Sequence, residues 1–286
     1  MVTKRSSEFR RLSLRTAAAA ARNGAGYESE MDQRHMSVTT GAKRHEGGMG
    51  ETLRVIFHAL IIAVVIRTFL FQPFNIPSGS MKETLLVGDY LFVSKFSYGY
   101  SHFSLPFSPK LFSGRIWSRM PERGDIVVFR QPKDDSVDYI KRVIGLPGDR
   151  IQMIQGVLHI NDVPVKRERI DDFIETDETG RTTRVKRWRE TLPNGVSYTT
   201  LDLIDNGFYD NTKVYEVPPG HFFMMGDNRD NSTDSRVESQ VGYVPFENLV
   251  GRAQIIFFSV YEGESGWHFW RWPWSVRWGR LPTIVR

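Results

Sequence analysis

The chain has 286 residues, enough for one large domain or two small ones with a buried core. Its composition is that of a globular protein, with 40% hydrophobic residues, 25% charged residues and a formal net charge of +5. It contains no cysteine, which excludes disulfides, thiolate zinc sites, iron–sulfur clusters and a cysteine nucleophile. The positive charge is concentrated toward the two ends, which suits a membrane surface better than a nucleic-acid groove.

Residues 1–52 are expected to form a polar, cytoplasmic tail. The first 22 residues carry six basic side chains against one acidic side chain, and no apolar periodicity runs through the first 50 or so. This composition favours a mobile segment. A mitochondrial transit peptide is the alternative, but Glu28, Glu30 and Asp32 follow soon and argue against it.

A transmembrane helix is predicted over residues 53–72. The run Val55–Phe71 is apolar apart from His58 and Arg67, and about 20 such residues are needed to cross roughly 30 Å of hydrocarbon. Arg67 is expected to reach toward the nearer interface. A buried core helix and a cleaved signal peptide are alternatives, although the long preceding tail argues against the signal peptide.

Basic residues near this segment indicate its orientation. Lys43, Arg44 and Arg54 precede it, whereas Lys82 is the one Lys or Arg among the 20 residues that follow. The positive-inside rule therefore predicts a single-pass protein with a cytoplasmic N-terminus and with everything beyond residue 72 outside.

Beyond the apolar segment the pattern changes to short β-branched and aromatic runs separated by Gly, Pro, Asn and Asp, which predicts a mainly β, antiparallel fold. We assign residues 73–150 and 215–262 to a catalytic β domain. The more charged residues 151–214 are expected to form an inserted, smaller β subdomain. The predicted strands are Tyr90–Ser94, Gly124–Phe129, Tyr139–Ile144, Ile151–Gln155, Val157–Ile160, His221–Met225 and Arg252–Val260.

The segment Pro77–Met81 places two serines on either side of a glycine just beyond the apolar segment. Glycine allows close approach of another chain, and a serine amide there can point at a substrate oxygen. The same residues are also ordinary turn formers.

Lys141 lies within a predicted strand, on one face with Tyr139 and Val143. A lysine between apolar neighbours can simply mark an edge strand. A catalytic role requires burial, because lowering the pKa of an ammonium from about 10.4 to near 7 costs roughly 4 to 5 kcal/mol. A neutral amine can then deprotonate a serine.

The loop Gly226–Arg236 is dense in hydrogen-bonding side chains. It could be a solvated turn, and its spacing does not match the twelve-residue calcium loop. Asn231 begins a glycosylation sequon of low specificity. The sequence lacks Gly-x-Ser-x-Gly, Ser-x-x-Lys, His-Glu-x-x-His and the phosphate-binding Gly-Lys-Ser/Thr.

Four segments follow the apolar segment in chain order: Pro77–Met81, Arg123–Phe129, the predicted strand with Lys141, and the loop Gly226–Arg236. Together they resemble bacterial type I signal peptidase, a membrane-bound Ser-Lys peptidase. The resemblance implies that Ser80 is the nucleophile and Lys141 the general base. It also implies that the Ser78 hydroxyl and the Ser80 amide form the oxyanion hole. By the same resemblance Ser232 orients the lysine, Asp234 and Arg236 form a supporting ion pair, and the substrate pockets are lined by Ile76, Pro77, Met81, Leu85, Tyr139 and Ile140.

The implied function is removal of N-terminal signal peptides from exported preproteins after small-x-small sites, in the bacterial inner membrane. The resemblance implies no metal or other cofactor. Expected partners are preproteins and membrane lipids, with the protein export machinery as a further candidate and no nucleic acid.

Residues 263–286 are expected to lie at the membrane interface. They hold five of the seven tryptophans together with Arg271, Arg277 and Arg280, and Trp with Arg suits the headgroup layer. Packing in a β core or an oligomer contact is the alternative.

Three other functions fit parts of the sequence. A pilin-processing peptidase would use the same dyad, and the self-cleaving repressors share Ser-Lys chemistry but carry a DNA-reading helix. A non-catalytic, membrane-tethered β module would leave Ser80 and Lys141 far apart and exposed.

Overall fold

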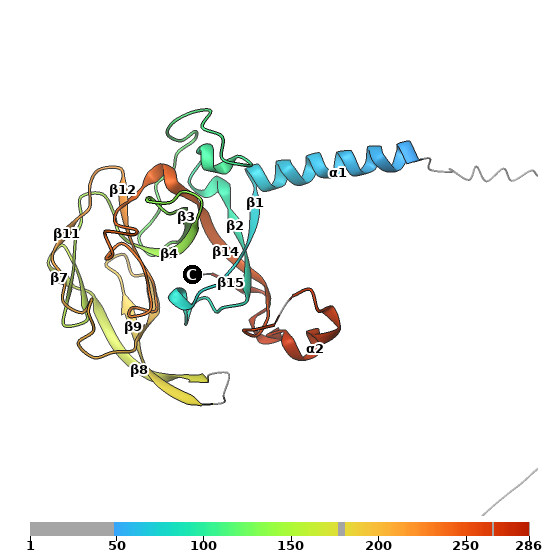
Figure 1. Ribbon diagram of the computed structural model, residues 1–286. Helices are drawn as coiled ribbons and strands as arrows, with labels where there is room; N and C mark the ends of the chain where they lie inside the picture. Colours follow the sequence, from blue (N-terminus) through green and yellow to red (C-terminus); the bar gives the residue numbers. More distant parts are fainter. Residues whose placement is uncertain (1–48, 177–180, 265, 286) are drawn as a thin grey trace, which may run out of the picture. The chain divides into compact units, whose positions relative to one another are not determined.

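The computed structural model describes residues 49–176, 181–264 and 266–285 (Figure 1). Nearly all of the expected tail, residues 1–48, therefore lies outside the described residues. Residues 48–286 form one compact unit. Outside its first helix this unit is mostly antiparallel β-sheet, as the sequence predicts.

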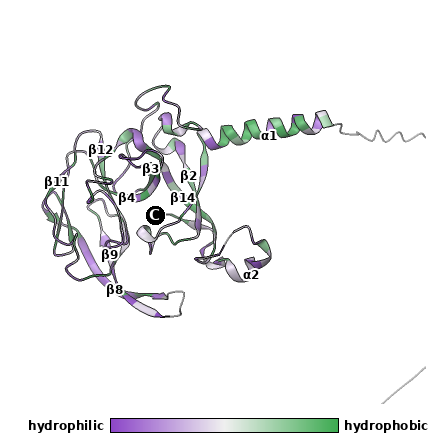
Figure 2. Ribbon diagram, viewed as in Figure 1, coloured by the Kyte–Doolittle hydropathy of each residue, from purple (hydrophilic) through white to green (hydrophobic). Residues whose placement is uncertain are grey.

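Helix α1 (Met49–Phe69) is the apolar segment, and its side chains are exposed along nearly its whole length. Among the described residues it is the one helix long and apolar enough to cross a membrane, with a mean hydropathy of 1.9 (Figure 2). It begins four residues before the predicted segment and ends three residues earlier. The early end follows from the next strand, in which Pro73 has no N–H to continue the helix.

The largest sheet has the strand order β1-β2-β14-β3-β4-β12-β13, with β15 paired to β14. Its strands are antiparallel neighbours, so residues far apart in sequence meet side by side. Their bounds are β1 (Phe71–Asn75), β2 (Asp89–Ser94), β3 (Ile126–Arg130), β4 (Asp138–Gly145), β12 (His221–Met225), β13 (Val244–Pro245), β14 (Leu249–Ser259) and β15 (Thr283–Ile284).

Two smaller sheets contain the strands of the expected insertion. One has the order β11-β5-β6-β7 and the other β10-β9-β8. Their bounds are β5 (Arg150–Ile154), β6 (Val157–Ile160), β7 (Val163–Pro164), β8 (Lys166–Thr176), β9 (Thr182–Thr191), β10 (Ser197–Asp202) and β11 (Tyr215–Glu216). Gln155 and Gly156, both with positive φ, close the β5–β6 hairpin.

The hydrophobic core joins the insertion to the large sheet. Ile151 and Met153 of β5 pack in one buried cluster with Ile144 of β4 and Phe223 of β12. The strands of the expected insertion therefore lie in sheets of their own but share a core with the large sheet.

The C-terminal segment is attached to the large sheet through Asp89, whose side chain is fully buried. Arg280 donates to Asp89 at 2.7 Å, and Arg277 lies 3.7 Å from the same carboxylate. In and around the short helix α2 (Trp272–Ser275), several tryptophan rings face outward. The exposed fractions are 89% for Trp267, 60% for Trp270, 36% for Trp272, 79% for Trp274 and 58% for Trp278.

Candidate active site

Ser80 lies in a single 3₁₀ turn (Gly79–Met81) that follows β1. Two contacts from Asn228 hold this turn in place: its backbone N–H donates to the Ser80 carbonyl at 3.1 Å, and its side-chain amide donates to the Gly79 carbonyl at 3.0 Å. The loop that carries Asn228 comes from a distant part of the sequence, so tertiary structure fixes the position of the serine.

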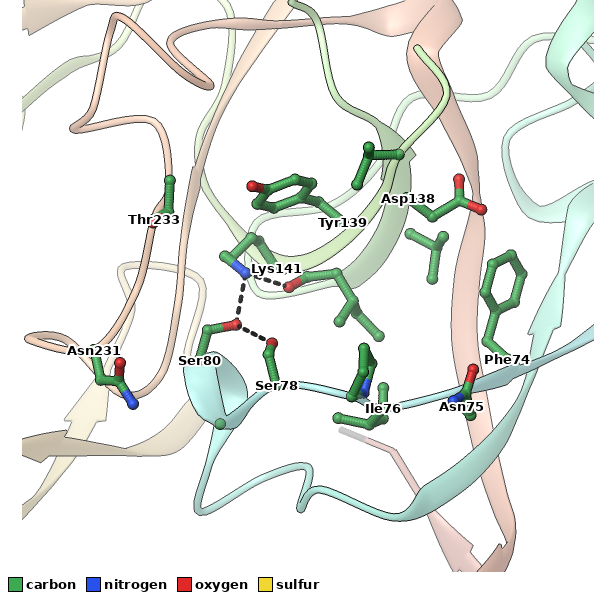
Figure 3. Close-up of a pocket in the computed structure, with 15 residues that line it drawn as sticks. Phe74, Asn75, Ile76, Ser78, Ser80, Asp138, Tyr139, Lys141, Asn231 and Thr233 are labelled. Atoms are coloured by element: carbon green, nitrogen blue, oxygen red, sulfur yellow. Dashed lines mark hydrogen bonds between the residues drawn. The ribbon is translucent and has the colours of Figure 1, made fainter. Parts of the chain in front are cut away.

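Lys141 lies in β4 between two strands of the large sheet, with 2% of its surface exposed. Its Nζ donates to the Ser80 hydroxyl at 2.7 Å and to the Ile140 carbonyl at 3.0 Å (Figure 3). The Tyr139 ring lies 5.2 Å from the amine and covers it. The structure therefore brings the predicted serine and lysine into direct contact.

Burial lowers the pKa of Lys141 to about 8, from a usual value near 10.5. Desolvation is the largest cause. Asp234 and Asp227 act in the opposite direction, and Arg236 adds a smaller decrease. At pH 7 a fraction of about one tenth of the molecules then carries a neutral amine, far more than for an exposed lysine.

Ser78 lies on the other side of the serine. Its hydroxyl is 3.3 Å from the Ser80 hydroxyl, and both side chains face the same cleft (Figure 3). This position places a second hydroxyl beside that of Ser80.

Ser232, Asp234 and Arg236 form a buried network next to this pair. Asp234 is fully buried and accepts from the Ser232 hydroxyl at 2.8 Å, from the Gly226 N–H at 3.0 Å and from Arg236 at 2.8 Å. Arginine and hydrogen bonds hold the pKa of Asp234 below its usual value despite burial. In the described structure Ser232 contacts Asp234 and forms no hydrogen bond with Lys141.

Gly226 explains how closely these groups approach. A Cβ at this position would lie 2.2 Å from the Ser232 hydroxyl and 2.5 Å from the Ser80 carbonyl oxygen. Any larger residue would have to displace one of the two serines.

A second buried ion pair lies behind the lysine strand and was not predicted. Arg142 is fully buried and binds Asp227 through two hydrogen bonds of 2.9 and 2.7 Å. Thr84 also donates to Asp227. Strand alternation predicts that Arg142 lies on the face of the strand opposite to Lys141. The sequence around Arg142 does not indicate that its partner is Asp227, 85 residues away.

The cleft beside the dyad has a volume of about 510 Å³. Of the six predicted pocket residues, Ile76, Pro77, Tyr139 and Ile140 line it. Met81 and Leu85 instead are fully buried in the core below and do not line it. Residues that sequence reasoning missed also contribute to the cleft: Phe74, Asn75, Val128, Val137, Asp138, Asn231 and Thr233.

Comparison with known proteins identifies the family. The family model for signal peptidase, peptidase S26, matches residues 49–258. The chain belongs to this family. Signal peptidase I of Rickettsia typhi is 50% identical over 209 residues, covering 70% of this chain and 77% of the relative. Signal peptidase I of Rickettsia conorii is also 50% identical, covering 70% and 76%.

A crystal structure of a signal peptidase I from Enterococcus faecalis V583 is a further match, with 24% identity, coverage of 47% of this chain and 97% of that chain, and a TM-score of 0.27. Membership of the signal peptidase family makes this chain a serine peptidase, a hydrolase that removes signal peptides. The apolar helix α1 is consistent with the membrane association of such enzymes.

Asp234→Asn tests the electrostatics of the buried network of Ser232, Asp234 and Arg236. The substitution leaves buried Arg236 without its counter-charge, so we expect the free energy of unfolding to fall by about 3 to 5 kcal/mol. Because Asp234 raises the pKa of Lys141, its neutralisation should also move the activity–pH midpoint of the surviving folded enzyme downward. Chemical denaturation and a pH profile measure the two effects. The exposed Asp134→Asn is the control, and an unchanged midpoint in Asp234→Asn would contradict the assignment.

Proposed function

We propose that this chain is a membrane-anchored signal peptidase in which Ser80 is the nucleophile and neutral Lys141 is its general base. One observation carries the proposal: the 2.7 Å contact between the two side chains at a site where the amine has lost its water. The non-catalytic module would have left these residues apart, and the contact argues against it.

The reaction begins when the neutral Lys141 amine accepts the proton of the Ser80 hydroxyl. The Ser80 oxygen attacks the carbonyl carbon of the scissile peptide bond, and the resulting ammonium gives its proton to the leaving amine. Water, deprotonated by the same amine, then attacks the ester carbonyl carbon. The bond to the Ser80 oxygen breaks, the Lys141 ammonium returns its proton to that oxygen, and the acyl group leaves as a carboxylic acid. Because a protonated Lys141 can only donate to Ser80, the neutral form is the active one.

The developing oxyanion would accept hydrogen bonds from the Ser80 amide and from the Ser78 hydroxyl. A donor of this kind contributes about 10²- to 10³-fold to a rate. The position of Ser78, 3.3 Å from the nucleophile, supports this role.

An extended substrate fits along the cleft between β1 and β4. On one side of β4, strand β12 pairs only with the segment from Arg142 to Gly145. The earlier part of β4, Asp138–Lys141, pairs with β3 on its other side but has no strand partner on the β12 side. Phe74–Ile76 line the opposite wall. Backbone pairing with such an edge supplies affinity, while alternate side chains enter the pockets, as small-x-small recognition requires.

The membrane arrangement follows from α1 and the flanking charges. We place α1 across the bacterial inner membrane as a single pass, with residues preceding it in the cytoplasm and the catalytic domain outside. The preproteins that the enzyme cleaves would reach it from the export machinery. The 50% identity with signal peptidases I favours this function over the pilin-processing and repressor alternatives.

The exposed tryptophans near the C-terminus would lie in the headgroup layer. Their outward positions argue against the core-packing alternative. Arg277 and Arg280 attach this segment to the β domain through Asp89, so docking of the rings would fix the domain against the lipid.

Replacing either member of the dyad should abolish cleavage. We expect Ser80→Ala and Lys141→Met each to reduce kcat/KM for a preprotein by at least about 10⁴-fold, because the remaining hydrogen-bond donors cannot replace the nucleophile or the base. The exposed Lys133→Met is the matched control and should retain activity. Cleavage is measured by mass spectrometry of the products, and circular dichroism confirms folding. Substantial activity in Ser80→Ala would refute the proposal.

The pH dependence of cleavage should report the lysine. Since the folded pKa of Lys141 is lowered to about 8, kcat/KM should rise tenfold per pH unit below this value and level off above it. Initial rates between pH 6 and 10 on a preprotein in detergent measure the midpoint. A midpoint near 10.5 would show that the amine is not desolvated.

Interfacial docking of the tryptophans can be measured with the full-length chain in vesicles that contain brominated lipids, which quench nearby indoles. Replacing Trp267, Trp270, Trp274 and Trp278 by Phe should remove most of the quenchable emission, because these rings are exposed. Trp188→Phe is the control, since this ring lies under Arg167 in the β domain. Equal quenching in the two variants would exclude docking.

A further inference from the structure

A second, smaller cavity lies where α1 meets the β domain, away from the dyad. Its lining includes Arg67 and Thr68 from the last turn of α1, Lys95 after β2, and Arg130 at the end of β3. Its volume of about 50 Å³ corresponds to about four waters.

Lys95 is buried at this cavity without a counter-ion. It is 3% exposed, and its amine donates to two neutral acceptors, the carbonyls of Ser104 at 3.2 Å and Phe103 at 3.4 Å. Desolvation is the main cause that lowers the pKa of Lys95 to about 8, and Asp138 opposes this decrease. Arg130, Arg67 and Arg115 lower it further, so the amine lies in a positive field.

The charges around the cavity do not cancel. Arg130 pairs with Asp138 at 3.3 Å, whereas Arg67 forms no ion pair with any described residue. The three cations Arg67, Lys95 and Arg130 line the cavity, and Asp138 is the one carboxylate described here that opposes their charge. An isolated buried charge is costly, which makes this a site that favours an anion.

Thr68 supplies a second, independent observation. It is 4% exposed and lines the cavity, yet its hydroxyl has no hydrogen-bond partner among the described residues. A buried hydroxyl without a partner costs free energy. An oxygen-rich anion in the cavity would accept from this hydroxyl and from Lys95 together.

The surroundings of the cavity indicate the source of the anion. Tyr100 donates to the Phe69 carbonyl at 2.8 Å and so fixes the end of the apolar helix beside the cavity. On the rim, Phe107 is fully exposed. The last turn of α1, the helix that Figure 2 colours as predominantly hydrophobic, contributes Arg67 and Thr68 to the cavity.

We propose that this cavity binds the phosphate group of an anionic phospholipid, with its acyl chains along α1 and the rim at Phe107. The phosphate would accept hydrogen bonds from Arg67, Thr68 and Lys95, a set of charged and hydroxyl donors that suits its oxygens. The proposal rests on the insertion of α1 in a membrane given above. A lipid held here would fix the depth of the β domain.

Titration of the full-length chain in a nonionic detergent with dioleoylphosphatidylglycerol, followed by native mass spectrometry, tests this site. We expect Arg67→Gln and Lys95→Met each to raise the Kd by about tenfold or more, because each loses a charged hydrogen bond to phosphate. Arg119→Gln removes an exposed arginine outside the cavity and should change the Kd less than twofold. Arg67 is exposed, so its variant tests the site even if Lys95→Met does not fold.

Two probes separate the sources of the anion. Dioleoylglycerol, which has the chains but no phosphate, should bind at least tenfold more weakly. Inorganic phosphate at the concentration of the lipid should not displace it; displacement would show a site for free phosphate and overturn the lipid assignment. Equal Kd values in the Arg67→Gln and wild-type chains would overturn the site itself.

The outcome of the lipid-binding experiments is independent of the catalytic roles proposed for Ser80 and Lys141. Ser80→Ala should bind the lipid with an unchanged Kd while losing peptide cleavage, so a failure of the dyad leaves the lipid result intact. Release of the chain from membranes by alkaline carbonate would refute the insertion of α1, and this readout requires neither lipid titration nor activity.

Discussion

The proposed active site depends on one constraint: Lys141 must lose its water without gaining a carboxylate that would keep it charged. Two buried carboxylates, Asp234 and Asp227, lie close enough to raise its pKa. Each is paired with an arginine of its own, Arg236 and Arg142, which limits this effect. Desolvation therefore dominates, and the amine next to Ser80 has a lowered pKa.

The β-sheet makes this balance possible because it positions charges on both faces of one strand. Alternation places Lys141 toward the cleft and Arg142 toward the opposite face, where Asp227 binds it. The loop after β12 then supplies both carboxylates from one segment. A shift of the β4 register by one residue would move the arginine into the cleft and bury the lysine against Asp227.

The sequence predicted most of the large sheet. The runs Tyr90–Ser94 and Tyr139–Ile144 are rich in β-branched or aromatic residues, and the structure has the strands β2 and β4 there with nearly the same bounds. The long strands β8 and β9 were not predicted. Their residues are mostly charged and at least partly exposed, with Val185 as the one buried apolar side chain that the structure describes in the pair, so alternation gave no signal.

For the candidate site, too, the sequence predicted some features and not others. Ser80 and Lys141 could be named from motifs and a family resemblance, because their local sequences are distinctive. Local sequence could not decide whether Lys141 is buried, since the same residues also fit an edge strand. Met81 and Leu85 show the converse: they lie close to Ser80 in sequence, but their side chains are buried in the core.

With α1 placed across the membrane as proposed, the short connection between α1 and Ser80 would give the bilayer a role in selecting the cleavage site. Between Phe69 and Ser80 the chain forms β1, which pairs with β2 along its whole length, rather than a free linker. A paired strand holds its ends at a fixed separation, at most about 3.4 Å per residue. The serine therefore lies at a set height above the end of the helix. A preprotein whose own apolar segment spans the same bilayer would present its cleavage site at a matching height, so pocket shape and membrane depth would select the bond together.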